Sequence, residues 1–262
     1  MSFWHAKLDA ELRRFDRLAI AFSGGCDSTL LAEAARRVLG EPNVLLLLAD
    51  STLLPRAEAA RARELAAKAG LRLEVIALDP LADELVRAND PRRCYHCKKR
   101  VFTALFERAR SLGFETLADG ANLDDRGDYR PGAQAADELG VVHPLREFPK
   151  AEIRNLAKSW NLPTWDLPAA ACLASRIPTG TPLDAASLAM IEAGETAVEK
   201  LGYTGFRVRK TGPTEARLEL KKDDLERARS EFADLEARLR ELGFETVTLA
   251  AYRTGAMNDF AK

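Results

Sequence analysis

The 262-residue chain lacks the features of a membrane-spanning, secreted or strongly charged protein. No wholly apolar run is longer than Val44 to Ala49, which is far too short to cross a bilayer. Its N-terminus has no apolar stretch of the kind that a signal peptide carries. The 39 basic residues nearly balance the 40 acidic ones, which argues against binding to nucleic acid through charge. We therefore expect a cytoplasmic protein with neither a nucleic-acid nor a membrane partner.

Cysteine is also scarce, with four residues in the whole chain. In a chain without a secretion signal, so few thiols indicate a reducing compartment, where cysteine clusters are read as metal or catalytic sites. The hydrophobic share of 47% and the charged share of 30% are typical of a soluble globular protein. The length suffices for one large domain or for two modest ones.

The most informative segment is Ser23-Gly-Gly-Cys-Asp-Ser28, which joins an apolar, strand-like run (18–22) to a run with helical spacing (30–38). Its two glycines allow backbone N–H groups to turn toward one anion, and Ser28 lies where a helix dipole favours negative charge. The Lys-Ser/Thr ending of a Walker A loop is missing. The alternative is a glycine turn that binds no ligand.

The pattern S-G-G-x-D-S resembles the PP-loop of the ATP pyrophosphatase superfamily. Those enzymes hold the β,γ-pyrophosphate of ATP and cleave between the α and β phosphates, which adenylates a substrate. The resemblance implies a nucleotide site formed by Ser23, Gly24, Gly25, Asp27 and Ser28.

Strand-like and helix-like segments alternate from residue 18 to about residue 160. We expect strands at 18–22, 44–49, 73–77 and 115–118, a short run at 141–143, and helices at 56–69, 98–112 and 150–160. This alternation predicts an α/β fold, a doubly wound and mostly parallel sheet with helices on both faces. In such a sheet, ligands bind at the carboxyl ends of the strands, where the glycine-rich segment lies.

The pattern changes around residues 162–182, where four prolines break any regular element. Beyond them we expect a helix at 184–201, an antiparallel hairpin at 206–209 and 216–220, a charged helix at 223–242 and a strand at 245–253. The sequence therefore predicts two domains. We expect residues 1–170 to form a PP-loop domain and residues 171–262 to form a smaller α+β domain.

Two of the cysteines form the motif Cys94-Tyr-His-Cys97 at the start of a predicted helix. Thiolates at this spacing can converge on one metal, and the helix dipole favours their ionised form. Taken alone, the motif leaves structural zinc, a redox pair and coincidence open.

A third cysteine, Cys172, lies in a proline-bounded segment close in sequence to Arg176, which can stabilise a thiolate. An inert thiol under a loop is the alternative for Cys172, and Cys26 is interpreted as a packing residue.

Three segments resemble the LarE family of ATP-dependent sulfur transferases: residues 119–132, 172–178 and 251–258. Members of this family adenylate a carboxylate of pyridinium-3,5-biscarboxylic acid mononucleotide, release pyrophosphate and install sulfur as a thiocarboxylate. The product is the organic part of the nickel-pincer nucleotide cofactor of lactate racemase. The resemblance covers nearly the whole chain and implies catalytic roles for Cys172, Ser175 and Arg176.

The family has two sulfur sources. In one branch, a cysteine at the position of Cys172 gives up its own sulfur and becomes dehydroalanine. In the other branch, three cysteines hold a 4Fe–4S cluster that delivers exchangeable sulfide from its open iron. Cys94, Cys97 and Cys172 match the second branch, so we expect a 4Fe–4S cluster. Zinc bound by the same thiols, with water or His96 as the fourth ligand, is the alternative. The sulfide donor is not identified.

Other polar residues complete the predicted site. In the loop at 119–132, Asp125 and Asp128 are candidate Mg²⁺ ligands, and Arg126 and Arg130 are candidate phosphate contacts. Asp50 and Ser51 resemble an adenosine-contacting position in related nucleotide-binding sheets. A solvated polar loop is the alternative for the 119–132 segment.

The predicted hairpin places Arg207 and Arg209 on one face of a strand, and Arg217 and Glu219 on one face of its partner. If these faces coincide, they form a surface for a substrate that carries phosphate and carboxylates, which Arg176 and Arg253 could join. A half-exposed sheet with cross-strand ion pairs is the alternative. Glu195 matches a position where the family binds an anion or metal at a subunit interface, which implies a homo-oligomer.

Two other functions remain open on the sequence alone. A PP-loop tRNA thiolase also combines this loop with three cysteines, although the near-neutral charge and the lack of an RNA-binding appendage argue against it. A nucleotide-binding scaffold with structural zinc is the third hypothesis. The leading hypothesis is a sulfurtransferase that acts on a small nucleotide and uses ATP, Mg²⁺ and a 4Fe–4S cluster.

Overall fold

The computed structural model describes residues 2–127, 131–168 and 170–253. The chain divides into two compact units. The first contains Met1–Leu78 and Cys94–Ala170, and the second contains Asp79–Arg93 and Ala171–Lys262. Each unit has a sheet and a hydrophobic core of its own. Within the described residues, no helix is both long enough and apolar enough to cross a membrane.

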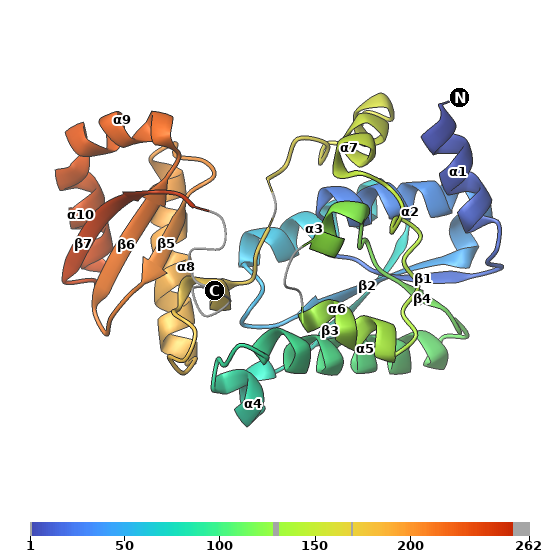
Figure 1. Ribbon diagram of the computed structural model, residues 1–262, viewed down its shortest axis with the longest axis horizontal. Helices are drawn as coiled ribbons and strands as arrows, with labels where there is room; N and C mark the ends of the chain where they lie inside the picture. Colours follow the sequence, from blue (N-terminus) through green and yellow to red (C-terminus); the bar gives the residue numbers. More distant parts are fainter. Residues whose placement is uncertain (1, 128–130, 169, 254–262) are drawn as a thin grey trace. The chain divides into compact units, whose positions relative to one another are not determined.

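The sheet of the first unit has four parallel strands in the order β3-β2-β1-β4 (Figure 1). The strands are β1 (Leu18–Ala21), β2 (Val44–Asp50), β3 (Arg72–Ala77) and β4 (Leu117–Ala118). The chain adds β2 and β3 on one side of β1 and then returns to place β4 on the other side. The carboxyl ends of β1 and β4 therefore flank a topological switch point, where sheets of this kind bind ligands.

Alternate strand residues enter two cores on opposite faces of this sheet. Leu18, Ile20 and Leu46 pack with α1 (Phe3–Leu12), α2 (Cys26–Leu39), α3 (Arg56–Lys68) and α7 (Lys150–Ser159). Ala19 and Leu45 pack with α5 (Arg93–Ser111) and α6 (Pro131–Glu138). Figure 1 shows α2 and α7 on one side of the sheet and α5 on the other. Helices on both faces of a parallel sheet confirm the predicted α/β class.

The second unit is a small α+β fold. Its sheet has the order β5-β6-β7, with β5 (Arg207–Lys210) antiparallel to β6 (Glu215–Leu220) and β7 (Thr246–Ala251) parallel to β6. One face of the sheet packs on α8 (Ala185–Lys200), α9 (Leu225–Ser230) and α10 (Phe232–Glu241). Gly194 lets α8 approach closely, because a Cβ atom there would lie 3.4 Å from Val208 and 3.2 Å from Leu239. The antiparallel pairing of β5 with β6 confirms the predicted hairpin.

Three predicted elements differ from the structure. The helix expected at 98–112 begins five residues earlier, at Arg93, so both cysteines of the Cys-x-x-Cys motif are helical. The strand expected at 115–118 has two residues, and Val142 joins it by an isolated bridge to Ala118. The prediction of a single helix at 223–242 is wrong. The chain forms a 3₁₀ turn (Lys222–Asp224), α9 and α10, because Glu231 leaves helical geometry at φ −99° and ψ 13°.

The segment Asp79–Arg93 belongs to the second unit, although sequence analysis placed it in the first domain. It contains a 3₁₀ turn (Pro80–Ala82) and α4 (Glu84–Arg87). Asn89, in the left-handed region at φ 54°, is buried, and its side-chain amide donates to the carbonyls of Pro178 and Thr181 at 2.9 Å each. We call this segment the strap. The remaining 3₁₀ turns lie at Glu41–Asn43, Leu123–Gly127 and Leu173–Arg176.

Candidate functional site

The glycine-rich loop between β1 and α2 needs glycine at its second position. Gly24 has φ +70°, and a Cβ atom there would lie 2.9 Å from the Cα atom of Ala62, in α3. A side chain would therefore be strained by the backbone conformation and would also meet backbone that cannot move aside. Because Gly24 has no side chain, α3 packs directly against the loop.

The start of α2 is arranged as an anion site. Gly25 is the N-cap of α2 and has no side chain that could accept a hydrogen bond from the first N–H groups of the helix. The hydroxyls of Ser23 and Ser28 lie 3.3 Å apart beside these groups. Ser28 also donates to the carbonyl of Gly25 at 3.3 Å. Helix dipole, N–H groups and two hydroxyls together suit a phosphate.

Lys150 is a site residue that sequence analysis missed. It opens α7, and its ammonium group donates to both carboxylate oxygens of Asp27, at 2.5 and 2.6 Å. The interaction places a cation beside the glycine-rich loop, although 123 positions separate the two residues in the chain. The sequence contained one signal. A lysine in the first turn of a helix interacts unfavourably with the helix dipole, so its presence there indicates a compensating interaction elsewhere.

The loop after β4 lies against the same helix terminus. A Cβ atom on Gly120 would lie 3.1 Å from the backbone nitrogen of Ser28 and 3.0 Å from Cβ of Asp27. Further along, the carboxylate of Asp125 accepts the N–H of Asn122 at 3.0 Å. The two loops that flank the switch point therefore touch. Asp128 and Arg130 lie outside the described residues, and the side chain of Arg126 is not described.

Asp50, at the end of β2, is held by two arginines of α3. Its carboxylate accepts from Arg56 at 2.5 Å and from Arg63 at 2.6 Å. Burial opposes ionisation here, but these hydrogen bonds and the two positive charges hold the pKa of Asp50 below its ordinary value. The Ser51 hydroxyl accepts the N–H of Leu53 at 3.3 Å. A contact of Asp50 or Ser51 with adenosine stays a prediction.

All four cysteines are thiols rather than disulfides. Cys94 and Cys97 lie in the first turns of α5 and are partly exposed. Cys26 is buried in the core, and its burial raises the pKa of the thiol, in agreement with a packing role. Cys94 and Cys97 belong to the first unit and Cys172 to the second.

Cys172 lies in a positively charged part of the second unit. It caps the 3₁₀ turn Leu173–Arg176, and its sulfur accepts a hydrogen bond from Arg93 at 3.4 Å. Burial works against ionisation, yet the charge and hydrogen bond of Arg93 and the charge of Arg176 lower the pKa of Cys172 below its ordinary value. This environment is that of a reactive thiol. Arg93, at the end of the strap, directly precedes Cys94 in the chain.

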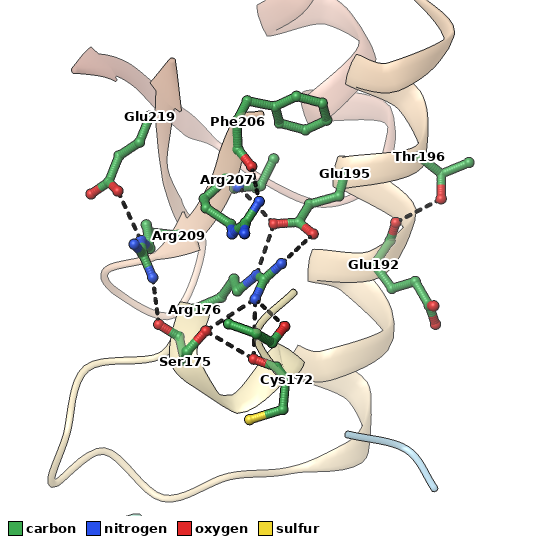
Figure 2. A network of polar contacts seen from close by, with 12 residues as sticks. Cys172, Ser175, Arg176, Glu192, Glu195, Thr196, Phe206, Arg207, Arg209 and Glu219 are labelled. Carbon is green, nitrogen blue, oxygen red and sulfur yellow. Dashed lines mark hydrogen bonds and ion pairs between the residues drawn. The ribbon is translucent and has the colours of Figure 1, made fainter. Parts of the chain in front are cut away.

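Arg176 fixes the backbone around Cys172 (Figure 2). Its guanidinium forks onto the carboxylate of Glu195 through two hydrogen bonds of 2.9 Å. It also donates to the carbonyls of Ala171 at 2.6 Å and Cys172 at 3.1 Å. The Ser175 hydroxyl donates to the same Cys172 carbonyl at 2.8 Å. Arg176 is only 2% exposed, so the structure gives it a fixed position within the second unit.

The register of β5 and β6 brings the predicted hairpin residues onto one face. Arg207 lies opposite Glu219, and Arg209 lies opposite Arg217. Arg209 and Glu219 are buried and bonded at 3.0 Å, and Arg209 also donates to the carbonyl of Ser175 at 2.6 Å. Arg217 shares the Glu219 carboxylate at 3.1 Å. This face therefore carries both the predicted cations and the alternative cross-strand ion pairs.

Arg207 differs from its neighbours. Burial and the nearby charge of Arg176 lower the pKa of its guanidinium below the ordinary value. It lies 5.8 Å from the ring centre of Tyr252 and donates to the carbonyl of Phe206 at 2.6 Å. Arg253 is exposed. In this part of the second unit, arginines outnumber glutamates, so an anionic ligand is favoured there.

No preformed metal centre appears in the part of the chain that the structure describes. Within residues 2–127, 131–168 and 170–253, no three side chains of His, Cys, Asp or Glu are gathered into a group that could hold a metal ion. The predicted cluster would use cysteines of both units. The support for this cluster therefore comes from the sequence.

Comparisons with known proteins bear on the whole chain. The family model described as NAD synthase matches residues 7–110. An uncharacterised protein of Synechocystis is 37% identical over 94% of this chain and 95% of its own length. The pyridinium-3,5-bisthiocarboxylic acid mononucleotide synthase of Lactiplantibacillus plantarum is 35% identical over 97% of this chain and 93% of its own length. An uncharacterised protein of Methanocaldococcus jannaschii is 28% identical over 91% of each chain.

Proposed function

Since this chain belongs to the LarE family of ATP-dependent sulfur transferases, we propose that it acts on pyridinium-3,5-biscarboxylic acid mononucleotide. ATP adenylates a carboxylate of this nucleotide, and sulfur then replaces the activated oxygen to give a thiocarboxylate of the nickel-pincer nucleotide cofactor. The observation that carries the proposal is the 35% identity with the synthase of L. plantarum over nearly the full length of both chains. The anion site at the start of α2 supports it.

The ATP step belongs to the first unit. A carboxylate oxygen of the substrate attacks the α-phosphorus, and the bond to the β-phosphate oxygen breaks, so that pyrophosphate leaves. The N–H groups and hydroxyls around Ser23 and Ser28 suit the leaving pyrophosphate. Lys150 would neutralise part of its charge. Mg²⁺ held by Asp125 and Asp128 would supply further charge neutralisation.

The sulfur step uses Cys172. The Arg93 guanidinium favours its thiolate, while Arg176 and Ser175 hold its carbonyl in place. We propose that Cys94, Cys97 and Cys172 ligate a 4Fe–4S cluster. Such a cluster would supply sulfide from its fourth iron. Three thiols, one of them with a lowered pKa, are a donor set that suits iron.

The arginine-rich face of the second unit would bind the anionic substrate. Arg207, Arg209 and Arg253 would contact its phosphate and carboxylates, with Glu219 and Glu195 holding the arginines in position. The carboxylate of Glu195 is bonded to Arg176 and to the N–H of Val208. We also propose a cytoplasmic location, from the scarcity of cysteine, and a homo-oligomer, from the family resemblance at Glu195.

The first experiment separates the two steps. Exchange of pyrophosphate with ATP is measured with and without the pyridinium mononucleotide, in the wild type, Lys150→Met and Cys172→Ala. We expect substrate-dependent exchange that falls about 100-fold in Lys150→Met and is retained in Cys172→Ala, which makes no thiocarboxylate. The control is Lys158→Met, on the same helix and over the ring of Trp165. Exchange that does not depend on the mononucleotide would refute the proposed substrate.

A second experiment identifies the sulfur source. The intact protein is weighed by mass spectrometry before and after one turnover, following anaerobic purification. An unchanged mass, together with iron and acid-labile sulfide in the protein, supports the cluster. Loss of the mass of one H₂S from Cys172 would contradict it and would indicate a sacrificial cysteine.

A further inference from the structure

His143 forms a bridge that neither the sequence analysis nor the proposed mechanism uses. It follows the short bridge between Val142 and β4, and its side chain is 8% exposed. Nδ1 lies 2.6 Å from a carboxylate oxygen of Asp119, at the end of β4, and Nε2 lies 3.1 Å from one of Asp137, in α6. One imidazole thus joins the sheet to α6.

On the sheet side, the bridge reaches the anion site within two residues. The same oxygen of Asp119 accepts the N–H of Ala121 at 3.0 Å. Gly120, between them, lies against Asp27 and the backbone nitrogen of Ser28 with no room for a Cβ atom. A displacement of Asp119 must therefore move Gly120 against the start of α2.

On the other side, α6 holds the cysteine turn of α5. Glu138 follows Asp137, and its carboxylate accepts the hydroxyl of Tyr95 at 2.7 Å and the ammonium of Lys99 at 3.2 Å. Tyr95 lies between Cys94 and Cys97. At the other end of α6, a Cβ atom on Gly132 would lie 2.8 Å from the Lys98 side chain. The first turns of α5 are therefore fixed against α6.

We propose that α6 couples the ATP site to the Cys94–Cys97 turn, and that His143 is the positioning residue that maintains this coupling. All the contacts lie within the first unit, and they form one continuous chain from the backbone nitrogen of Ser28 to Tyr95. Such a chain can transmit a change only if both ends respond to it. The proposal rests on the proposed function in one respect, because it takes ATP to be the anion at the glycine-rich loop.

The charge of His143 sets the strength of the bridge. Burial disfavours the imidazolium, yet the hydrogen bond to Asp119 and the charges of Asp119 and Asp137 raise its pKa above the ordinary value. Arg146 also donates a hydrogen bond to Asp137, at 3.3 Å. A raised folded pKa means that the stabilisation is complete below the unfolded value of about 6.5 and is lost as pH rises through the folded pKa.

The test measures MgATP affinity by calorimetry from about pH 6 to about pH 9. The wild type should lose affinity by about 5-fold or more as His143 loses its proton. His143→Gln should bind more weakly at low pH and lose this pH dependence. His5→Gln is the matched control, because His5 also faces an aspartate, Asp9 at 3.7 Å, but on α1. Identical pH profiles for the wild type and His143→Gln would overturn the proposal.

The second readout is amide hydrogen exchange at the start of α5, with and without MgATP. MgATP should slow exchange around residues 94–98 in the wild type. The slowing should disappear in His143→Gln and in Tyr95→Phe, which lacks only the hydroxyl that reaches Glu138. Slowing retained in both variants would refute the coupling. If His143→Gln does not fold, Asp137→Asn weakens the same bridge and takes its place.

These measurements separate the two proposals. MgATP binding and amide exchange require no acyl acceptor. A chain that fails to exchange pyrophosphate in response to the pyridinium mononucleotide would refute the proposed substrate while leaving both readouts of the coupling intact.

Discussion

Individual residues form the anion site. Two glycines with similar backbone conformations show whether glycine is needed only for its conformation or also because a neighbouring helix leaves no room for a side chain. Gly24 has φ +70°, and a Cβ atom there would lie 2.9 Å from the backbone of Ala62. Gly70 has φ +67°, but a Cβ atom at that position would meet nothing within 4 Å. Both positions disfavour a side chain because of their conformation. Only Gly24 also has to let a helix approach.

We expect Gly24→Ala to lower the free energy of unfolding by about 2 kcal/mol or more and to weaken MgATP binding. Gly70→Ala should cost about 1 kcal/mol and leave MgATP binding unchanged. Urea unfolding and calorimetry measure the two quantities. Equal losses of stability in both variants would show that the close approach of α3 contributes nothing.

Residues also show where sequence analysis reaches its limit. The role of Ser23 to Ser28 is predictable because strand, glycines and helix are contiguous, so local geometry determines the anion site. Lys150 and His143 act through carboxylates far away in the chain. Such pairings arise from the order of strands in the sheet. A single sequence does not show which distant residues this order brings into contact.

At the scale of elements, the β5–β6 hairpin contains the ion pair with the clearest energetic consequence. Arg209 and Glu219 are 6% and 3% exposed in their side chains, while Arg217 is 35% exposed. Removing one member of a buried pair leaves an uncompensated charge, whereas removing a partly exposed partner costs little.

Arg209→Met should therefore lower the free energy of unfolding by about 3–5 kcal/mol, and Arg217→Met by less than about 1 kcal/mol. Chemical denaturation of the two variants tests this difference. The double variant Arg209→Met with Glu219→Met should recover most of the loss, because no buried charge then remains unpaired. A double variant as unstable as Arg209→Met would contradict this account.

Helices and strands were mostly predictable from hydrophobic period, and the differences have local causes. The break at Glu231 interrupts a run whose charged residues suit a helix throughout, so periodicity gave no warning. The early start of α5 places Cys94 and Cys97 within the helix, which the Cys-x-x-Cys motif itself suggested.

At the scale of the whole molecule, the chain passes between the two units three times, because the strap returns to the second unit before α5 begins. Composition does not reveal this, since most residues of the strap are exposed or half-buried and its buried ones are Pro80, Val86 and Asn89. Asn89 makes its two side-chain hydrogen bonds to carbonyls of residues that lie 89 and 92 positions later.

A fragment of residues 1–170 should therefore contain an unprotected strap. We expect trypsin to cut this fragment rapidly after Arg87, Arg92 or Arg93, while the full chain resists cleavage there. Mass spectrometry of a timed digest identifies the sites. Asn89→Ala in the full chain should increase cleavage at the same positions, and equal resistance of fragment and full chain would contradict the assignment of the strap.

The bond from the Val208 N–H to Glu195 has a consequence for association with other chains. β5 is an outer strand of its sheet, and an outer strand with open backbone donors is a template for unwanted β-pairing between molecules. Here a helix carboxylate covers one of those donors. Loss of the Glu195 side chain would thus be expected to promote self-assembly through this strand, visible as turbidity.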